Sequence, residues 1–267
     1  MSDWSPAQYR RFADERAQPF HDLLCLVEPG GIRRAVDLGC GPGELTALAA
    51  RRLATEEMIG IDNSPAMLAE AAAHAGAVPA GGVVRFIEDD IARWTADGDR
   101  DLVLAAASLQ WVPRHAEVLA RWTAALAPGG QLAVQVPANA SMPSHTVAAE
   151  VASLEPFCSA FGPEGPPVDP VREHVLEPEQ YAQLLYQLGF EHQHVRLQVY
   201  PHVLPSSRDV VQWVRGTTLT RFQRRLPAEL FEHFVAAYES ALLAVIGDHA
   251  PYFFPFRRVL FCAQLPR

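Results

Sequence analysis

The sequence contains no lysine, so all 22 of its basic residues are arginines. They are outnumbered by 31 acidic residues, and the formal net charge at pH 7 is −9. A surface with this excess of negative charge repels the phosphate backbone that DNA- and RNA-binding proteins must neutralise. The composition therefore argues against a nucleic-acid partner.

Long apolar runs are also missing. Stretches such as 101–109 are much shorter than the roughly 20 residues that cross a bilayer as a helix. Residues 1–16 mix charged and polar side chains and lack the apolar core of a signal peptide. We therefore expect a cytoplasmic protein with no membrane partner.

Cysteine is scarce and scattered, with four residues and no C-x-x-C pair. This spacing indicates neither a disulfide framework nor a zinc site, so we expect free thiols and no bound metal. Nothing in the sequence fixes an oligomeric state. Hydrophobic residues make up 49% and charged residues 20%, as is usual for a globular chain that buries one main core.

The first half of the chain alternates short β-like runs with amphipathic helical stretches, the pattern of βαβ units around a parallel sheet. Helices are expected at 44–53, 65–75 and 114–126, the last ending before Pro128-Gly129-Gly130. The expected strands are 34–38, 58–61, 83–87, 102–106 and 131–136.

The second half is mainly helical. After a proline- and glycine-rich loop at 161–170, the pattern predicts helices at 178–188, 207–222 and 227–246, and strands at 191–200 and 257–265. The chain thus predicts one α/β domain with a doubly wound, mostly parallel, seven-stranded sheet. We expect an α/β core over 1–140, a mostly helical cap with one late strand over 141–256, and the last core strand over 257–267. Such an insertion usually covers the carboxyl ends of the strands as a lid.

A glycine-rich turn follows the first expected strand and opens the first helix, in the run Val36-Asp37-Leu38-Gly39-Cys40-Gly41-Pro42-Gly43. Glycines let backbone approach a ligand closely, and a helix start offers free N–H groups. Asp62 closes the second strand 19 residues after Gly43, where an acidic residue of a nucleotide-binding unit meets the ribose hydroxyls. Asp62 could instead cap a helix, although Ser64 before Pro65 suits that role better.

The G-x-G-x-G spacing, with Asp37 two residues before the first glycine, resembles the class I (Rossmann-like) S-adenosylmethionine-dependent methyltransferases. The runs Glu88-Asp89-Asp90-Ile91 and 105–111 resemble two further motifs of that family, in the right order. The resemblance implies S-adenosyl-L-methionine as cofactor, with Asp37 near its ammonium group and Asp90 and Ile91 at the adenine. The cofactor-binding residues that it implies are Asp37, Gly39, Cys40, Gly41, Gly43, Asp62, Asn63, Asp90, Ile91, Ala106 and Ala107.

Residues outside these motifs are similar to the branch of the family that methylates trans-aconitate. They include the opening 1–6, 108–111, 135–137 and several residues after 200, whereas 153–173 departs from that branch. The resemblance implies that a carboxylate of a small polycarboxylate becomes a methyl ester, with S-adenosylhomocysteine as the second product. An ionised carboxylate needs no general base, so positioning and desolvation would carry catalysis.

The acceptor carboxylates that are not methylated need cationic and hydrogen-bonding partners. Arginine suits this role, because its planar guanidinium binds a carboxylate through two parallel hydrogen bonds. The candidate acceptor-binding residues are Tyr9, Arg16, Gln110, Trp111, Gln135, Tyr200, His202, Arg221 and Arg258. Alternatives are a methyltransferase acting on a small-molecule hydroxyl, amine or carbon, with His202 as a base, a nicotinamide-dependent oxidoreductase, and a non-catalytic protein that keeps the fold as a scaffold.

Overall fold

The computed structural model describes the backbone of residues 13–78 and 81–267, and the side chains of residues 17–78 and 81–267. Its centre is one sheet in the strand order β3-β4-β2-β1-β5-β6-β8-β7. The strands are β1 (Arg34–Leu38), β2 (Glu57–Asp62), β3 (Gly76–Ala77), β4 (Val83–Glu88), β5 (Arg100–Ala106), β6 (Leu126–Pro137), β7 (His192–Leu204) and β8 (Tyr252–Gln264). The predicted doubly wound α/β fold is confirmed.

The predicted strand number of seven is wrong by one. The additional strand, β3, is a two-residue segment paired antiparallel with β4. Two residues are too short to show a period in the sequence. The helix expected at 65–75 is correspondingly shorter: α4 (Pro65–Ala71) continues as the single 3-10 turn η1 (Ala72–His74) before β3 begins.

Five strands, β4, β2, β1, β5 and β6, run parallel, and β8 is inserted antiparallel between β6 and β7. The carboxyl ends of parallel strands meet at one edge of the sheet, where open α/β sheets bind ligands. The turns after β1, β2, β4 and β5 therefore gather on one side of the molecule. These four turns carry the predicted cofactor residues.

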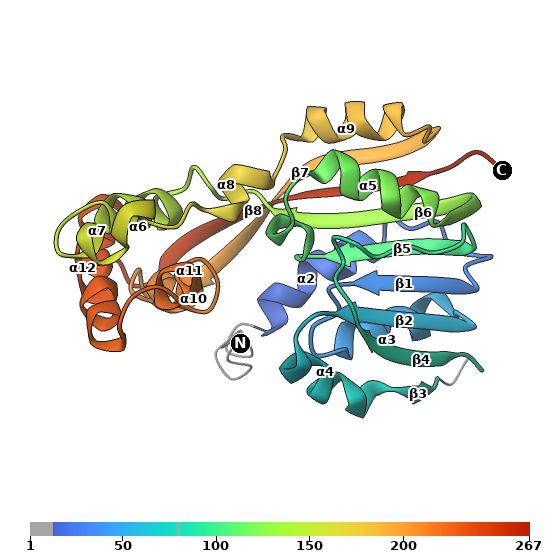
Figure 1. Ribbon diagram of the computed structural model, residues 1–267, viewed down its shortest axis with the longest axis horizontal. Coiled ribbons are helices and arrows are strands. Elements are labelled where there is room, and N and C mark those ends of the chain that lie inside the picture. Colours follow the sequence, from blue (N-terminus) through green and yellow to red (C-terminus); the bar gives the residue numbers. More distant parts are fainter. Residues whose placement is uncertain (1–12, 79–80) are drawn as a thin grey trace.

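Neighbouring residues of a buried strand point to opposite faces of the sheet, so both faces carry apolar side chains. Each face is therefore covered by helices. Ala35 packs with α2 (Ala13–Leu24) and α3 (Glu44–Leu53) on one face. Val36 packs with α5 (His115–Ala124) and α9 (Pro178–Gln187) on the other. Figure 1 shows the two layers of helices with the sheet between them.

The remaining helices form the cap, which Figure 1 shows beyond the carboxyl ends of β1, β2 and β5. Its core is aromatic: Phe234 contacts Phe157 and Phe222, with ring centroids 5.3 and 4.7 Å apart. The helix predicted at 207–222 is broken at residues 216–219. The cap helices are α6 (Pro143–Ala152), α7 (Phe157–Ala160), η3 (Gly162–Glu164), α8 (Pro170–His174), α10 (Asp209–Arg215), α11 (Thr220–Gln223) and α12 (Ala228–Ile246).

Strands β7 and β8 connect the sheet to the cap as a two-stranded ribbon. Each strand has 13 residues and extends beyond the range that the sequence predicted. Pro201 and Pro255 face each other in this extension. Proline cannot donate to a ladder and argues against a strand, which explains why the pattern ended at residue 200 and resumed at 257. Within the part of the chain that the structure describes, no helix combines the length and apolar character needed to cross a bilayer.

Candidate active site

The glycine turn between β1 and α3 is held against β2. The backbone N–H groups of Gly39 and Cys40 both donate to the carbonyl of Ile61, at 2.7 and 2.9 Å. A Cβ at position 39 would lie 2.2 Å from the Cβ of Ser108, and one at position 43 would lie 2.6 Å from Cζ of Phe86. Two of the three motif glycines are thus required by packing inside the protein.

Gly41 is different, because no described atom outside its two chain neighbours lies within 4 Å of the place where its Cβ would be. Its φ of 54° lies in the left-handed region that favours glycine. Its N–H donates to Oδ2 of Asp62 at 2.9 Å. The middle of the turn therefore presents bare backbone to open space, as the approach of a ligand requires.

Asp37 is buried beneath this turn, with 2% of its surface exposed. Its Oδ2 accepts a 2.6 Å hydrogen bond from the hydroxyl of Thr46, and its Oδ1 has no hydrogen-bond partner among the described residues. Burial raises the pKa of Asp37 to about 7; the Thr46 hydrogen bond acts against this and the charge of Asp62 adds to it. A buried carboxylate oxygen without a donor fits a cationic ligand group.

Asp62 joins two segments at the end of β2. Its Oδ1 accepts from the N–H of Ser64 and its Oδ2 from the N–H of Gly41, both at 2.9 Å. Each carboxylate oxygen keeps a second lone pair, so the half-buried group can still accept from a diol. Ser64 caps α4 through the N–H of Met67, as the sequence predicted, and Asn63 is exposed beside it.

The turn after β4 is fixed by its own backbone. Oδ1 of Asp90 accepts from the N–H of Ala92 at 2.9 Å, and the carbonyl of Asp90 accepts from Arg93 and Trp94. The indole N–H of Trp122 donates to the carbonyl of Ile91 at 3.0 Å. Asp90 and Ile91 therefore lie in a rigid turn at the same edge of the sheet as Asp62.

Beyond β5 the chain is strained at Ala107, which has a left-handed φ of 56°. This conformation is uncommon for a residue with a side chain and persists only where its surroundings hold it. Here the Ala107 N–H donates to the carbonyl of Gln135, and its carbonyl accepts from Nε2 of Gln110. The Ser108 hydroxyl donates to the carbonyl of Leu38, which joins this turn to the glycine turn.

A buried histidine supports the short turn η2 (Leu109–Trp111). Nε2 of His115 lies 3.0 Å from the carbonyl of Leu109, which can only accept, so Nε2 carries the hydrogen. Nδ1 then accepts from the hydroxyl of Tyr181 at 2.8 Å. Burial lowers the pKa of His115 to about 4. The neutral ring holds the turn that carries Gln110 and Trp111.

Three of the predicted acceptor-binding residues lie together at this edge. Gln135 is paired with Ala106 across β5 and β6. Its Oε1 accepts a 2.7 Å hydrogen bond from Nη1 of Arg258, and both side chains are buried. Gln110 is buried on the adjacent turn, and its Oε1 has no hydrogen-bond partner within the described ranges. The group offers a cation and amides next to Ala106 and Ala107.

The other candidates are more dispersed. The hydroxyl of Tyr200 donates to Asp22, which with burial raises the pKa of Tyr200 above its ordinary value. The ring of His202 contacts Trp213, with centroids 4.9 Å apart, and Arg221 lies in the cap beside Asp169. Trp111 is 44% exposed. Tyr9 and the side chain of Arg16 lie outside the described residues.

Several residues of the site make contacts that the sequence does not indicate. Thr46 and Phe86 are separated in sequence from the residues that they contact, and a hydroxyl or phenyl ring alone points to no role. Ser108 lies in the predicted run 105–111, but its packing against position 39 was not expected. Of these residues, Thr46 could have been inferred from its position in the sequence, because it lies in the first turn of the helix that follows the glycine motif. The described residues contain no group of three His, Cys, Asp or Glu side chains that could hold a metal.

This strand order, glycine turn and buried acid define a class I methyltransferase that uses S-adenosylmethionine, and residues 35–130 match the methyltransferase domain family. The chain is 42% identical to the trans-aconitate 2-methyltransferase of Streptomyces avermitilis, over 99% of this chain and 97% of that protein. It is 43% identical to that of Delftia acidovorans, over 94% of this chain and 93% of that protein. The chain belongs to the trans-aconitate 2-methyltransferase family.

The structure itself is similar to that of the YcgJ protein of Bacillus subtilis. The TM-score is 0.60 at 15% identity, over 94% of this chain and 99% of that one. At this identity the likeness concerns the fold alone. The predicted family and cofactor are confirmed by the relatives, and the oxidoreductase alternative is excluded.

Proposed function

We propose that this protein transfers the methyl group of S-adenosylmethionine to a carboxylate of trans-aconitate, giving a monomethyl ester and S-adenosylhomocysteine. The names of its relatives support this acceptor. One structural observation carries the proposal: a carboxylate oxygen of Asp37, buried with no donor among the described residues, lies beneath a turn whose middle residue, Gly41, has no described side chain packed over it. A small ligand that bears a cation and needs close backbone contact fits this combination.

The cofactor would be held by groups from four turns. Asp37 would meet the ammonium group, and the backbone of Gly39, Cys40, Gly41 and Gly43 would pass beside the methionine part. The carboxylate of Asp62, with Asn63 beside it, would accept from the ribose hydroxyls, because each of its oxygens has a lone pair to spare. Asp90 and Ile91 would meet the adenine, and Ala106 and Ala107 would line the side that faces the acceptor.

When bound, S-adenosylmethionine supplies a methyl group already activated by the positive charge of its sulfonium. The protein therefore has to align the acceptor oxygen and exclude water, and no residue has to remove a proton from a carboxylate that is ionised at pH 7. Arg258 would bind an acceptor carboxylate through its guanidinium, which Gln135 orients at 2.7 Å. Gln110 would add an amide from the neighbouring turn.

Trp111, Tyr200 and His202 would complete the wall of the acceptor site. We place the reaction in the cytosol, with a small carboxylate as the substrate. The free thiols of Cys25, Cys40, Cys158 and Cys262 support a reducing compartment.

The test is product analysis with purified protein, S-adenosylmethionine and trans-aconitate. We expect one added methyl group by mass spectrometry, and we expect mild base to remove it as methanol because it is an ester. A base-stable product from a panel of alcohols and amines, with none from trans-aconitate, would refute the acceptor and keep the cofactor.

A further inference from the structure

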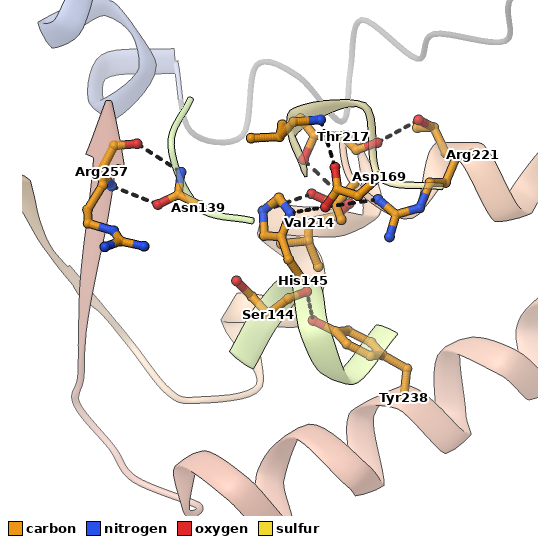
Figure 2. Close-up of polar contacts among 12 residues, drawn as sticks. Asn139, Ser144, His145, Asp169, Val214, Thr217, Arg221, Tyr238 and Arg257 are labelled. Atoms are coloured by element: carbon orange, nitrogen blue, oxygen red, sulfur yellow. Dashed lines mark hydrogen bonds and ion pairs between the residues drawn. The ribbon is translucent and has the colours of Figure 1, made fainter. Parts of the chain in front are cut away.

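The cap contains a buried charged cluster that the predicted cofactor site does not use. His145 lies in α6, Asp169 directly precedes α8, and Arg221 lies in α11. Figure 2 shows the three side chains directed toward one another from these separate elements. All are at least nine-tenths buried, with 4%, 9% and 8% of the side chain exposed.

Asp169 is well satisfied by its neighbours. Its Oδ2 accepts from Nδ1 of His145 at 2.6 Å, and its Oδ1 accepts from the backbone N–H of Val171 at 3.0 Å. Burial raises its pKa, but the hydrogen bond and charge of His145 and the charge of Arg221 outweigh burial, so the pKa lies below its ordinary value. Asp169 is therefore an ionised carboxylate whose charge is shared among several donors.

Arg221 is not satisfied in the same way. Its Nη1 is 3.3 Å from Oδ2 of Asp169, close enough for charge attraction. Yet its Nε, Nη1 and Nη2 are buried without a well-formed hydrogen bond to any described residue. One face of the guanidinium lies over the ring of Phe222, 4.5 Å from its centre. Asp169 neutralises this cation but leaves its N–H groups without a well-aligned acceptor in the part of the chain that the structure describes.

Two less buried arginines of the same cap have well-formed hydrogen bonds. Arg208 donates to Glu239 at 2.6 Å and to Asp248 at 2.7 Å, and Arg225 donates to the carbonyl of Phe161 at 2.7 Å. Buried polar groups in proteins are normally hydrogen-bonded, more so than exposed ones. Arg221 is more buried than these two arginines and has fewer hydrogen bonds, so we look for its acceptor in a group that the described residues do not supply.

The cluster adjoins the predicted acceptor site. Asp169 is the N-cap of α8, and α8 packs against η2, the turn that carries Gln110 and Trp111. Arg221 would thus face the acceptor from the cap, whereas Arg258 faces it from the sheet.

We propose that Arg221 binds a second carboxylate of the acceptor, and that Asp169 and His145 hold its guanidinium in position for that contact. A carboxylate supplies two parallel acceptors to the guanidinium fork, which matches the N–H groups that lack partners. The cap then selects polycarboxylates over acids with fewer carboxylates. This inference rests on the proposed function.

The experiment compares acceptors and variants together. The acceptors are trans-aconitate and two dicarboxylates that each lack one of its carboxylates and keep its double-bond geometry, mesaconate and cis-glutaconate. Wild type should prefer trans-aconitate over at least one of them by about tenfold or more in kcat/KM. Arg221→Gln should lose that preference. The substitution should lower kcat/KM for trans-aconitate much more than for the dicarboxylate that lacks the carboxylate bound by Arg221. The preference of Arg221→Lys should lie between that of wild type and that of Arg221→Gln.

Arg225→Gln is the matched control. Arg225 lies four residues further on, also stacks over a phenylalanine ring, and touches no group of the cluster. It should leave the ratio between acceptors unchanged. Titration with S-adenosylhomocysteine should give the same Kd for every variant that folds. If Arg221→Gln does not fold, the acceptor ratio of Arg221→Lys decides.

An equal loss for all three acceptors in the Arg221 variants, or no loss, would overturn the inference and assign the cluster to the stability of the cap. The proposed function would survive that result, because wild type would still form the ester. If wild type binds S-adenosylhomocysteine and esterifies none of the three acids, the proposed function fails first.

Discussion

The side chain of Ser108 fills the space that any side chain at position 39 would need, since a Cβ on Gly39 would lie 2.2 Å from the Cβ of Ser108. The Ser108 hydroxyl also donates to the carbonyl of Leu38, directly before the glycine. The turn after β5 is thus locked into the turn after β1. The contact between Ser108 and the glycine turn therefore fixes the predicted cofactor side of the site relative to the predicted acceptor side.

Gly39→Ala should lower the free energy of unfolding by about 2–4 kcal/mol, because it adds this overlap to the strain of alanine at a φ of 82°. Denaturant unfolding measures the loss. Ser108→Gly removes the overlapping atom, so the double variant should lose less than the sum of the two single variants. Strict additivity would show that the two turns do not press on each other.

The apo protein should become less stable as the pH rises through 7. Asp37 has a folded pKa of about 7, raised from 3.8, so its protonated form is favoured in the fold. Its contribution is complete below pH 3.8 and disappears as the pH passes 7, at a cost of about 4 kcal/mol at most. Unfolding measured between pH 5 and 8 should show this slope, and Asp37→Asn should flatten it.

Cofactor affinity should show the opposite trend. Because an ionised Asp37 attracts an ammonium group, the Kd for S-adenosylhomocysteine should decrease from pH 5.5 to about 7.5 and then level off. Calorimetric titration of wild type and Asp37→Asn gives the comparison. A Kd for wild type that is independent of pH would contradict the placement of the ammonium group at Asp37.

Asp62→Ala should weaken S-adenosylhomocysteine binding by about ten- to a hundredfold, because it removes the acceptor for Gly41 and the predicted acceptor for the ribose. Glu56→Ala is the control, since Glu56 is an exposed acid just before the same strand. Equal affinity of Asp62→Ala and wild type would refute the ribose contact.

Arg258→Lys should raise KM for trans-aconitate by about tenfold or more while the Kd for S-adenosylhomocysteine stays unchanged. Lysine keeps the charge and loses the planar fork that Gln135 orients. Arg257→Lys is a close control, because Arg257 is the preceding residue and donates to the exposed Ser141. A change in cofactor affinity without a change in KM would move Arg258 out of the acceptor site.

The first βα unit was predictable to the residue. The expected ranges 34–38 and 44–53 agree with β1 and α3, because a short apolar strand, a glycine turn and an amphipathic helix follow each other without ambiguity. The long β7 and β8 were truncated in the prediction, since Pro201 and Pro255 interrupt the alternation. The helix predicted at 207–222 ends at Arg215 with Gly216 as its C-cap, and the prediction passed over this glycine because the apolar pattern continues on both sides of it.

The sequence predicts a set of site residues but not the contacts between them. Gln135 and Arg258 were both expected near the acceptor, but their hydrogen bond depends on the antiparallel register of β6 and β8. The roles of Gly39 and Gly43 were expected to involve the ligand, whereas their missing side chains make room for Ser108 and Phe86. Contacts between residues far apart in sequence leave no local signal.

The position of β8 has a consequence for how the protein is made. This strand follows every other described element in the chain, yet it lies inside the sheet, and β7 has no other strand partner. During synthesis β7 and the cap helices emerge before the strand that joins them to the sheet. Until then β7 has two unpaired edges, and its side chains that are buried in the folded protein, such as Tyr200 and Leu204, lack their packing against β8. Protection of the nascent chain by chaperones is therefore needed most in the interval before residues 252–264 leave the ribosome.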